Sequence, residues 1–324
     1  MLHLRVMSPP DLTGDVVLRL QDDHAVINVV VLPGVCAGTA ADLVQADLAR
    51  EGANGVVADL RALGVDRAGS ITLQQIDVAV GTATEQAEAL APGYGTDAAV
   101  WETVEARARE ESVLTPSFLV FVVLAALIAA VGLVEDSPIL IVGAMVVGPE
   151  FGPIAGLSLG LAMRRLGGVR LAASTLAIGF AVGAVATLLG TWLADAVDLV
   201  PAGFSPHAQP LTGFIVEPSA LSFVVALLAG VAGTLSLTQA KAGALIGVLI
   251  SVTTIPAVAA IGVSAALGDL GDAVGATLQL LLNIVALVIA GVATLLVQRT
   301  AWDRMTRRGG GRRGLLPRAR IEGR

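Results

Sequence analysis

The sequence predicts an α-helical polytopic membrane protein with six transmembrane segments and an N-terminal α+β domain of the ferredoxin-like kind. Hydrophobic residues make up 55% of the chain and its mean hydropathy is +0.80, whereas soluble domains are roughly 45–50% apolar. The apolar residues are concentrated after Ser117, in stretches long enough to cross a bilayer. The residues before that point have the composition of a soluble domain.

Residues 1–95 are predicted to fold as the soluble domain because strand and helix patterns alternate along them. Strands are expected at residues 2–6, 25–32, 42–49 and 70–80, and helices at residues 11–21 and 51–64. This βαββαβ order is the ferredoxin-like, split βαβ pattern. The domain contains no glycine-rich phosphate loop, histidine cluster or catalytic carboxylate pair, so its residues predict no chemistry of their own.

Residues 96–115 are predicted to form a charged amphipathic helix that links the two domains at the cytoplasmic surface. A turn-rich boundary, Ala91-Pro-Gly-Tyr-Gly, precedes this helix. Pro116 then suits the first turn of the next helix, where its missing N–H costs no hydrogen bond.

The membrane domain, residues 116–298, contains six apolar segments. They are expected at residues 117–134, 138–163, 170–195, 220–237, 241–267 and 274–297. The basic connections all fall on one side of the membrane; they hold Arg164, Arg165 and Arg170, Lys241, and a basic tail at residues 299–320. This alternation predicts that both termini are cytoplasmic, in the inner membrane of a bacterial cell.

Proline interrupts the second and fifth segments near the middle, at corresponding places in the two halves of the chain. The residues that frame the breaks are Pro149, Gly152, Pro153 and Pro256. A proline removes a helical hydrogen bond for which lipid offers no replacement. Three segments in each half, with the middle one broken, predict a 3+3 inverted repeat with a site at the bilayer midplane. The alternative is six helices with no repeat, in which the prolines only shape the packing.

Polar residues at the two breaks are the candidate pathway for a solute or ion. Glu150 lies between the prolines of the first break, and Thr253 and Thr254, which precede Pro256, are expected to cap the second half-helix. A carboxyl group in a polar pocket between the breaks would carry a proton or bind a cation; the alternative is a glutamate that only stabilises the break. Gln279 and Asn283 share a face of the sixth segment. Their amide groups either hydrogen-bond to another helix or line the pathway.

Small residues at four-residue spacing predict close helix packing. They are Gly156 and Gly160 in the second segment and Gly243 and Gly247 in the fifth. The flat surfaces that such residues create also predict a homo-oligomer. At the cytoplasmic mouth of the fifth segment lie Gln239 and Lys241, of which Lys241 either snorkels to the interface or attracts an anion.

Charge and cysteine content exclude several classes of protein. The net charge of −7 and the lack of a long basic tract argue against nucleic-acid binding, and the single Cys36 excludes an internal disulfide. The membrane segments contain no His-Glu metal pattern, GxSxG motif or Asp pair, so we expect no enzyme, no metal and no cofactor. The first residues lack the apolar core of a signal peptide, and residues 321–324 read Ile-Glu-Gly-Arg, a protease-cleavage linker that we exclude from the fold.

Two stretches carry a resemblance to a known family. They begin at Ser137, with the signature Gly-Ala-Met…Pro…Gly-Pro, and at Lys241, with Ala-Gly-Ala-Leu-Ile-Gly. In these stretches the chain resembles domain of unknown function three-eight-nine, the "uncharacterised hydrophobic domain" proteins of bacteria and archaea. The resemblance covers the membrane domain, and the first domain is similar to one that precedes it in some members. Many members have no acid at the position of Glu150, so the resemblance implies architecture rather than a role for this carboxylate.

Together these features predict an integral membrane transport protein, a secondary transporter or channel for a small solute or ion. The alternative is a membrane-anchored sensor or regulator that acts through its ferredoxin-like cytoplasmic domain. A tightly packed membrane part with no polar site at the breaks would favour the alternative.

Overall fold

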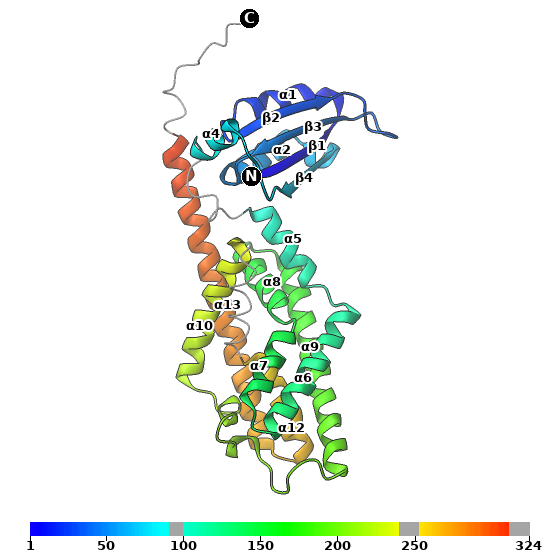
Figure 1. The fold of residues 1–324 in the computed structure, drawn as a ribbon, viewed down its shortest axis with the longest axis vertical. Helices are drawn as coiled ribbons and strands as arrows, with labels where there is room; N and C mark the ends of the chain where they lie inside the picture. The colour runs from blue at the N-terminus through cyan, green and yellow to red at the C-terminus, as the bar shows by residue number, and fades with distance from the viewer. Residues whose placement is uncertain (91–99, 240–252, 311–324) are drawn as a thin grey trace, which may run out of the picture. The chain divides into compact units, whose positions relative to one another are not determined.

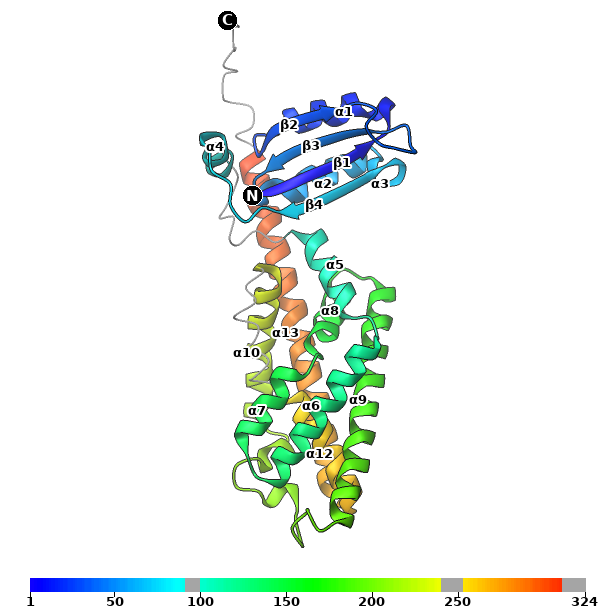
Figure 2. The same cartoon turned by 45° about the vertical axis from the view of Figure 1, so that its right-hand side comes forward.

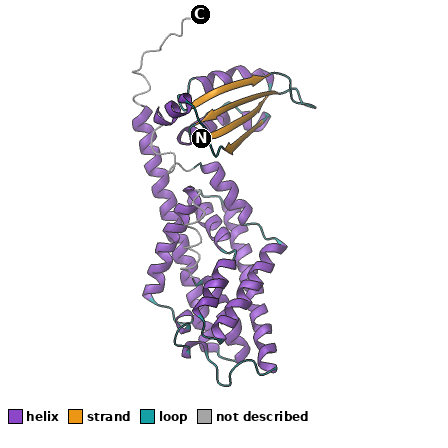
Figure 3. Ribbon diagram, viewed as in Figure 1, coloured by secondary structure: helices purple, strands orange, loops and turns teal. Residues whose placement is uncertain are grey.

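The computed structural model describes residues 1–90, 100–239 and 253–310 of the chain. These residues form two compact units, of which one comprises Met1–Val104 with the residues after Gln298, and the other comprises Glu105–Gln298. Strands occur only in the first unit among the described residues (Figure 3).

The first unit is a four-stranded antiparallel sheet with helices on one face. Its elements are β1 (Leu2–Ser8), α1 (Pro10–Gln21), β2 (Val26–Leu32), β3 (Asp42–Leu48), η1 (Arg50–Gly52), α2 (Ala53–Ala62), α3 (Val65–Ala68), β4 (Ser70–Gln75) and α4 (Thr82–Leu90). The strand order is β2-β3-β1-β4, and β3 is antiparallel to both β1 and β2. The strands β1 and β2 therefore run parallel with β3 between them, which is the split βαβ arrangement that the sequence predicts.

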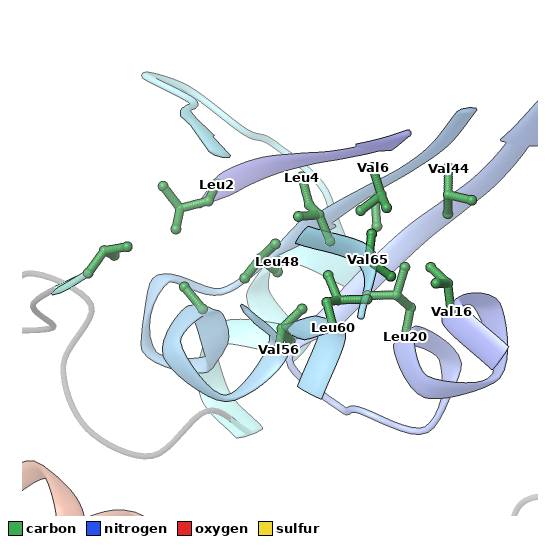
Figure 4. Packing of buried hydrophobic residues seen from close by; sticks show 13 residues of the cluster. Leu2, Leu4, Val6, Val16, Leu20, Val44, Leu48, Val56, Leu60 and Val65 are labelled. Carbon is green, nitrogen blue, oxygen red and sulfur yellow. The ribbon is translucent and has the colours of Figure 1, made fainter. Parts of the chain in front are cut away.

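The core of this unit follows from the two-residue period of the strands. Leu2, Leu4 and Val6 of β1 all point to one face of the sheet (Figure 4), where they are buried against residues of α1 and α2. On β1 the residues between them are more exposed. One face of the sheet is therefore covered by helices and the other is not part of this core.

The second unit is helical and begins within α5 (Trp101–Glu111). The elements that follow are α6 (Pro116–Val134), α7 (Pro138–Val147), α8 (Phe151–Ala162), α9 (Leu166–Ala196), η2 (Pro206–Ala208), η3 (Gly213–Ile215), α10 (Ala220–Gln239), α12 (Thr254–Leu267) and α13 (Leu270–Gly310). Thr115 caps α6, since its hydroxyl accepts a hydrogen bond from the Phe118 amide, and Pro116 occupies the first turn as predicted.

Four helices of this unit are long and apolar enough to cross a membrane: α6, α9, α10 and the Leu270–Ala301 part of α13. The pair α7 and α8 passes the same test as one broken span with a bend of 57°. The shorter apolar helix α12 coincides with the second half of the predicted fifth segment. The first half of that segment falls in residues 240–252, outside the described residues, so the structure supports four or five of the six predicted crossings.

Helix α12 is largely enclosed by the other helices of this unit. Ten of its residues are buried, and it packs against α9, α6 and α7 (Figures 1 and 2). Glycines allow the close approach: a Cβ atom on Gly183 of α9 would lie 3.1 Å from side-chain atoms of both Val122 in α6 and Val258 in α12. The N-terminus of α12 is thereby held inside the helical unit, beside the break between α7 and α8.

Candidate functional site

The break between α7 and α8 consists of Gly148, Pro149 and Glu150. Gly148 follows the last residue of α7 with an extended conformation, and Glu150 is the N-cap residue of α8. Gly152 and Pro153, which were expected to frame the break, lie inside α8 instead, because the helix already begins at Phe151. Pro149 is therefore the only proline within the break, and Pro153 lies in the first turn of α8, where a proline is tolerated.

Glu150 is buried, with 3% of its surface exposed. Its Oε1 atom accepts a hydrogen bond of 2.6 Å from the hydroxyl of Thr254, the first residue of α12. Gly148 permits this contact, since a Cβ atom at that position would lie 2.7 Å from Cγ1 of Ile255. The two helix breaks are thus in direct contact through these side chains.

Thr253 and Thr254 do not cap α12, contrary to the prediction. Thr253 is the N-cap residue but makes no side-chain capping hydrogen bond. Its Oγ1 atom instead accepts a hydrogen bond of 3.1 Å from Nδ2 of Asn283 in α13. Both threonine hydroxyls are therefore hydrogen-bonded to residues of other segments. These partners are distant in sequence, so the local sequence pattern could not predict the contacts. Pro256 is buried in the first turn of α12.

Gln279 and Asn283 extend the polar contacts along α13. Both are buried, and Nε2 of Gln279 donates to Oδ1 of Asn283 over 3.3 Å. The predicted pathway residues form a continuous series from α13 through the start of α12 to the break between α7 and α8; they are Gln279, Asn283, Thr253, Thr254 and Glu150.

Two oxygen atoms in this series lack a hydrogen-bond partner within the described part of the chain. They are Oε2 of Glu150 and Oε1 of Gln279, and both are buried. A buried acceptor without a partner costs on the order of 1–3 kcal/mol. Such atoms are suited to a proton, a cation or a hydrogen-bond donor of a solute, which would supply the missing partner.

The remaining predicted residues divide into packing positions and positions that are not described. A Cβ atom on Gly156 would meet Ser112, the residue after α5, and one on Gly160 would lie 2.9 Å from Val169 of α9, so both glycines are at tight helix contacts. Gln239 ends α10 and is half-buried. Gly243, Gly247 and Lys241 lie outside the described residues.

The connections opposite the basic ones carry polar contacts that sequence reasoning missed. The carboxylate of Asp136 accepts hydrogen bonds from the backbone amides of Leu211 and Thr212. His207 is exposed, and its Nδ1 atom lies 3.1 Å from the carboxylate of Asp272. This hydrogen bond is the main cause that raises the pKa of His207 above its usual 6.5. In the sequence, the available signal for such contacts was an acid close after a helix end, as at Asp136 after α6 and Asp269 after α12. Asp269 also accepts a hydrogen bond, from the hydroxyl of Ser205.

Residues 145–289 match the model of a protein family described as "Domain of unknown function (DUF389)". This part of the chain is therefore similar to the DUF389 family. The match begins inside α7 and ends inside α13, so it includes both helix breaks and every candidate pathway residue. Neither a curated protein nor a solved structure matches the chain. The matched region thus coincides with the part of the protein that holds the Glu150–Thr254 contact.

Proposed function

We propose that this protein moves a small solute or ion across a membrane, as a secondary transporter or channel, through a site at the two helix breaks. The observation that carries the proposal is the hydrogen bond between Glu150 and Thr254, which joins the break after α7 to the break before α12. A buried acid among apolar helices is costly, and such residues usually line an ion or proton pathway.

The proposed architecture has six crossings. In it, residues 240–252 and α12 together form the fifth crossing, and the two groups of three segments are inverted repeats with the broken segments at equivalent places. In this proposal both termini are in the cytoplasm of a bacterial cell and the protein is in the inner membrane, which the distribution of basic connections supports. We expect a homo-oligomer, no enzymatic activity and no nucleic-acid partner.

The chemistry of the proposed site rests on a change at Glu150. When its carboxyl group is ionised, Oε1 accepts from Thr254 and Oε2 is available to a cation. When it is protonated, the group gains one O–H donor and keeps an acceptor oxygen, so it can donate a hydrogen bond through Oε2 while Oε1 still accepts from Thr254. A proton or cation at Oε2 therefore changes the charge of the carboxyl group beside the contact between the two breaks, and this change is the proposed coupling to alternating access.

The experiment uses the full-length protein reconstituted in liposomes. Charge movement after rapid exchange of H⁺, Na⁺ or K⁺ is recorded on a supported membrane, and osmotic swelling reports uncharged solutes. We expect a flux above that of empty liposomes that falls at least tenfold, roughly 1.4 kcal/mol, in Glu150→Gln. Thr277→Val, which alters an exposed hydroxyl on α13 bonded only to its own helix, should retain the flux.

Wild-type liposomes that behave as empty ones across this panel would contradict the transport proposal. The same result would favour the sensor or regulator, in which the Met1–Val104 unit acts and the helices only anchor it. An equal flux in wild-type and Glu150→Gln protein would retain transport and remove Glu150 from its mechanism.

A further inference from the structure

A cavity of about 420 Å³ lies between α5, α8 and the start of α9, away from the Glu150–Thr254 contact. This volume is within the roughly 300–1,000 Å³ typical of small-molecule sites. Gly167 and Gly168 of α9 line the cavity and leave space there, since a Cβ atom on either would have nothing within 4 Å. All of its lining residues belong to the helical unit.

The rim of the cavity carries two arginines from different elements. Arg109 comes from α5, and Arg165 is the N-cap residue of α9. Arg165 forms an ion pair with Glu105, which also lines the cavity. Arg109 is exposed and has no carboxylate partner in the part of the chain that the structure describes. Arg164 and Arg170 flank the rim in sequence and are also exposed. The charged residues of the lining itself are two arginines and Glu105, which gives it a formal charge of +1; Glu110 and Glu111 follow Arg109 in sequence.

The lining below the rim is apolar. It includes Leu159 of α8, Met163 directly after that helix and Leu171 of α9. The apolar run of α8 ends at Ala162 and that of α9 starts at Leu166, so the cavity lies where membrane helices meet the polar boundary. An occupant must therefore present an anionic group to the rim and hydrocarbon to the lining beneath it.

We propose that this cavity binds one anionic phospholipid, such as phosphatidylglycerol, with its phosphate between Arg109 and Arg165 and an acyl chain along Leu159, Met163 and Leu171. Basic pockets between membrane helices are suited to anionic headgroups, and each Lys or Arg near such a surface contributes about 1 kcal/mol. A free phosphate satisfies the arginines but not the apolar lining, and for this reason the occupant is a lipid. The inference does not depend on the proposed transport function.

The effect of removing the charge of Glu105 distinguishes lipid binding from a purely structural role of its ion pair. Its carboxylate holds Arg165, so it competes with a phosphate for the same guanidinium group. Removing this charge frees Arg165, and anion binding should become tighter. A purely structural role for the ion pair predicts the opposite, because loss of the pair would only loosen the fold.

The test is native mass spectrometry of the full-length protein in detergent, titrated with phosphatidylglycerol or with phosphatidylcholine of the same acyl chains. We expect one phosphatidylglycerol to bind at least tenfold more tightly than phosphatidylcholine. Binding should weaken about fivefold in Arg109→Gln, recover partly in Arg109→Lys and strengthen in Glu105→Gln. Arg299→Gln, an exposed arginine that does not line the cavity, serves as the matched control and should leave the affinity unchanged.

Unfolding temperatures of the lipid-free variants establish that each one is folded before its lipid affinity is compared. Equal affinity for the two lipids, or equal loss in Arg109→Gln and Arg299→Gln, would overturn the proposal. Displacement of phosphatidylglycerol by inorganic phosphate at millimolar concentration would also overturn it, because the site would then belong to a soluble anion.

Discussion

Glu150 and Thr254 illustrate how single residues connect segments that are far apart in sequence. The carboxylate lies beside apolar helices, and the threonine hydroxyl donates to one of its two oxygens. Neither residue is required for its own helix, since Thr254 caps nothing and α8 begins at Phe151 without a side-chain cap. Their contribution to stability is therefore the contact that joins the two breaks.

Removing the hydroxyl of Thr254 should destabilise the protein. Thr254→Val keeps the size and leaves Oε1 of Glu150 buried without this donor, so the free energy of unfolding should fall by about 1–3 kcal/mol. Thr254→Ser should retain most of the stability. Thermal unfolding in detergent measures the effect, with Thr277→Val as the control, and equal stability of the Thr254→Val and Thr254→Ser proteins would show that the hydrogen bond contributes nothing.

His207 should make stability depend on pH. Its pKa in the folded protein is raised by the hydrogen bond to Asp272, so the contact stabilises the fold fully below the unfolded value of about 6.5 and loses this contribution as pH rises through the folded pKa. The unfolding temperature should therefore decline as pH increases above about 6.5. His207→Gln should flatten that decline, and an unchanged profile in this variant would assign the pH dependence to other groups.

At the scale of elements, the glycines of the membrane helices fall into two kinds. A Cβ atom on Gly262 of α12 would lie 2.8 Å from the backbone nitrogen of Leu188 in α9, and backbone cannot move aside as a side chain can. Gly143 of α7 has nothing within 4 Å of that position. Sequence spacing identifies both as small residues, but only the folded structure distinguishes a tight helix contact from an open surface.

This difference predicts opposite effects of alanine. Gly262→Ala should lower the free energy of unfolding by about 1–3 kcal/mol through overpacking. Gly143→Ala should raise it by up to about 1 kcal/mol, because alanine is the better helix former. Unfolding of the two variants in the same detergent compares them directly, and a loss of stability in Gly143→Ala equal to that in Gly262→Ala would contradict the helix packing described for α12.

The positions of the helix breaks could be predicted from the sequence, whereas their detailed geometry could not. Pro149 and Pro256 mark the breaks because proline removes a helical hydrogen bond wherever it occurs. Neighbouring helices determine that α8 starts at Phe151 and that Asn283 donates a hydrogen bond to Thr253. Local helix propensity carries no information about either feature. The same reason explains why Asp136 and Asp272 were missed, since their partners are 64 or more residues away.

At the scale of the whole molecule, the chain combines an α+β unit with a helical unit, part of which matches the DUF389 family. Hydrophobic patterning predicts both units, because strands alternate with period two and membrane helices are apolar throughout. It predicts the four strands of the first unit, although β4 (Ser70–Gln75) ends before the predicted residue 80. The pairing of the two breaks was expected from the predicted inverted repeat, and the Glu150–Thr254 contact is the observation on which the proposed function rests.

The most direct test of that contact is a disulfide between Gly148→Cys and Ile255→Cys in a Cys36→Ser background. A Cβ atom at residue 148 would lie 2.7 Å from Cγ1 of Ile255, so the two Cβ atoms should fall within the roughly 3.5–4.5 Å that a disulfide requires. Mild oxidation in native membranes, followed by mass spectrometry of the digested protein, should show the cross-link in most molecules. Gly143→Cys paired with Ile255→Cys should show none. Failure of the first pair to cross-link in folded protein, or equal cross-linking of both pairs, would contradict the claim that the two helix breaks form one site.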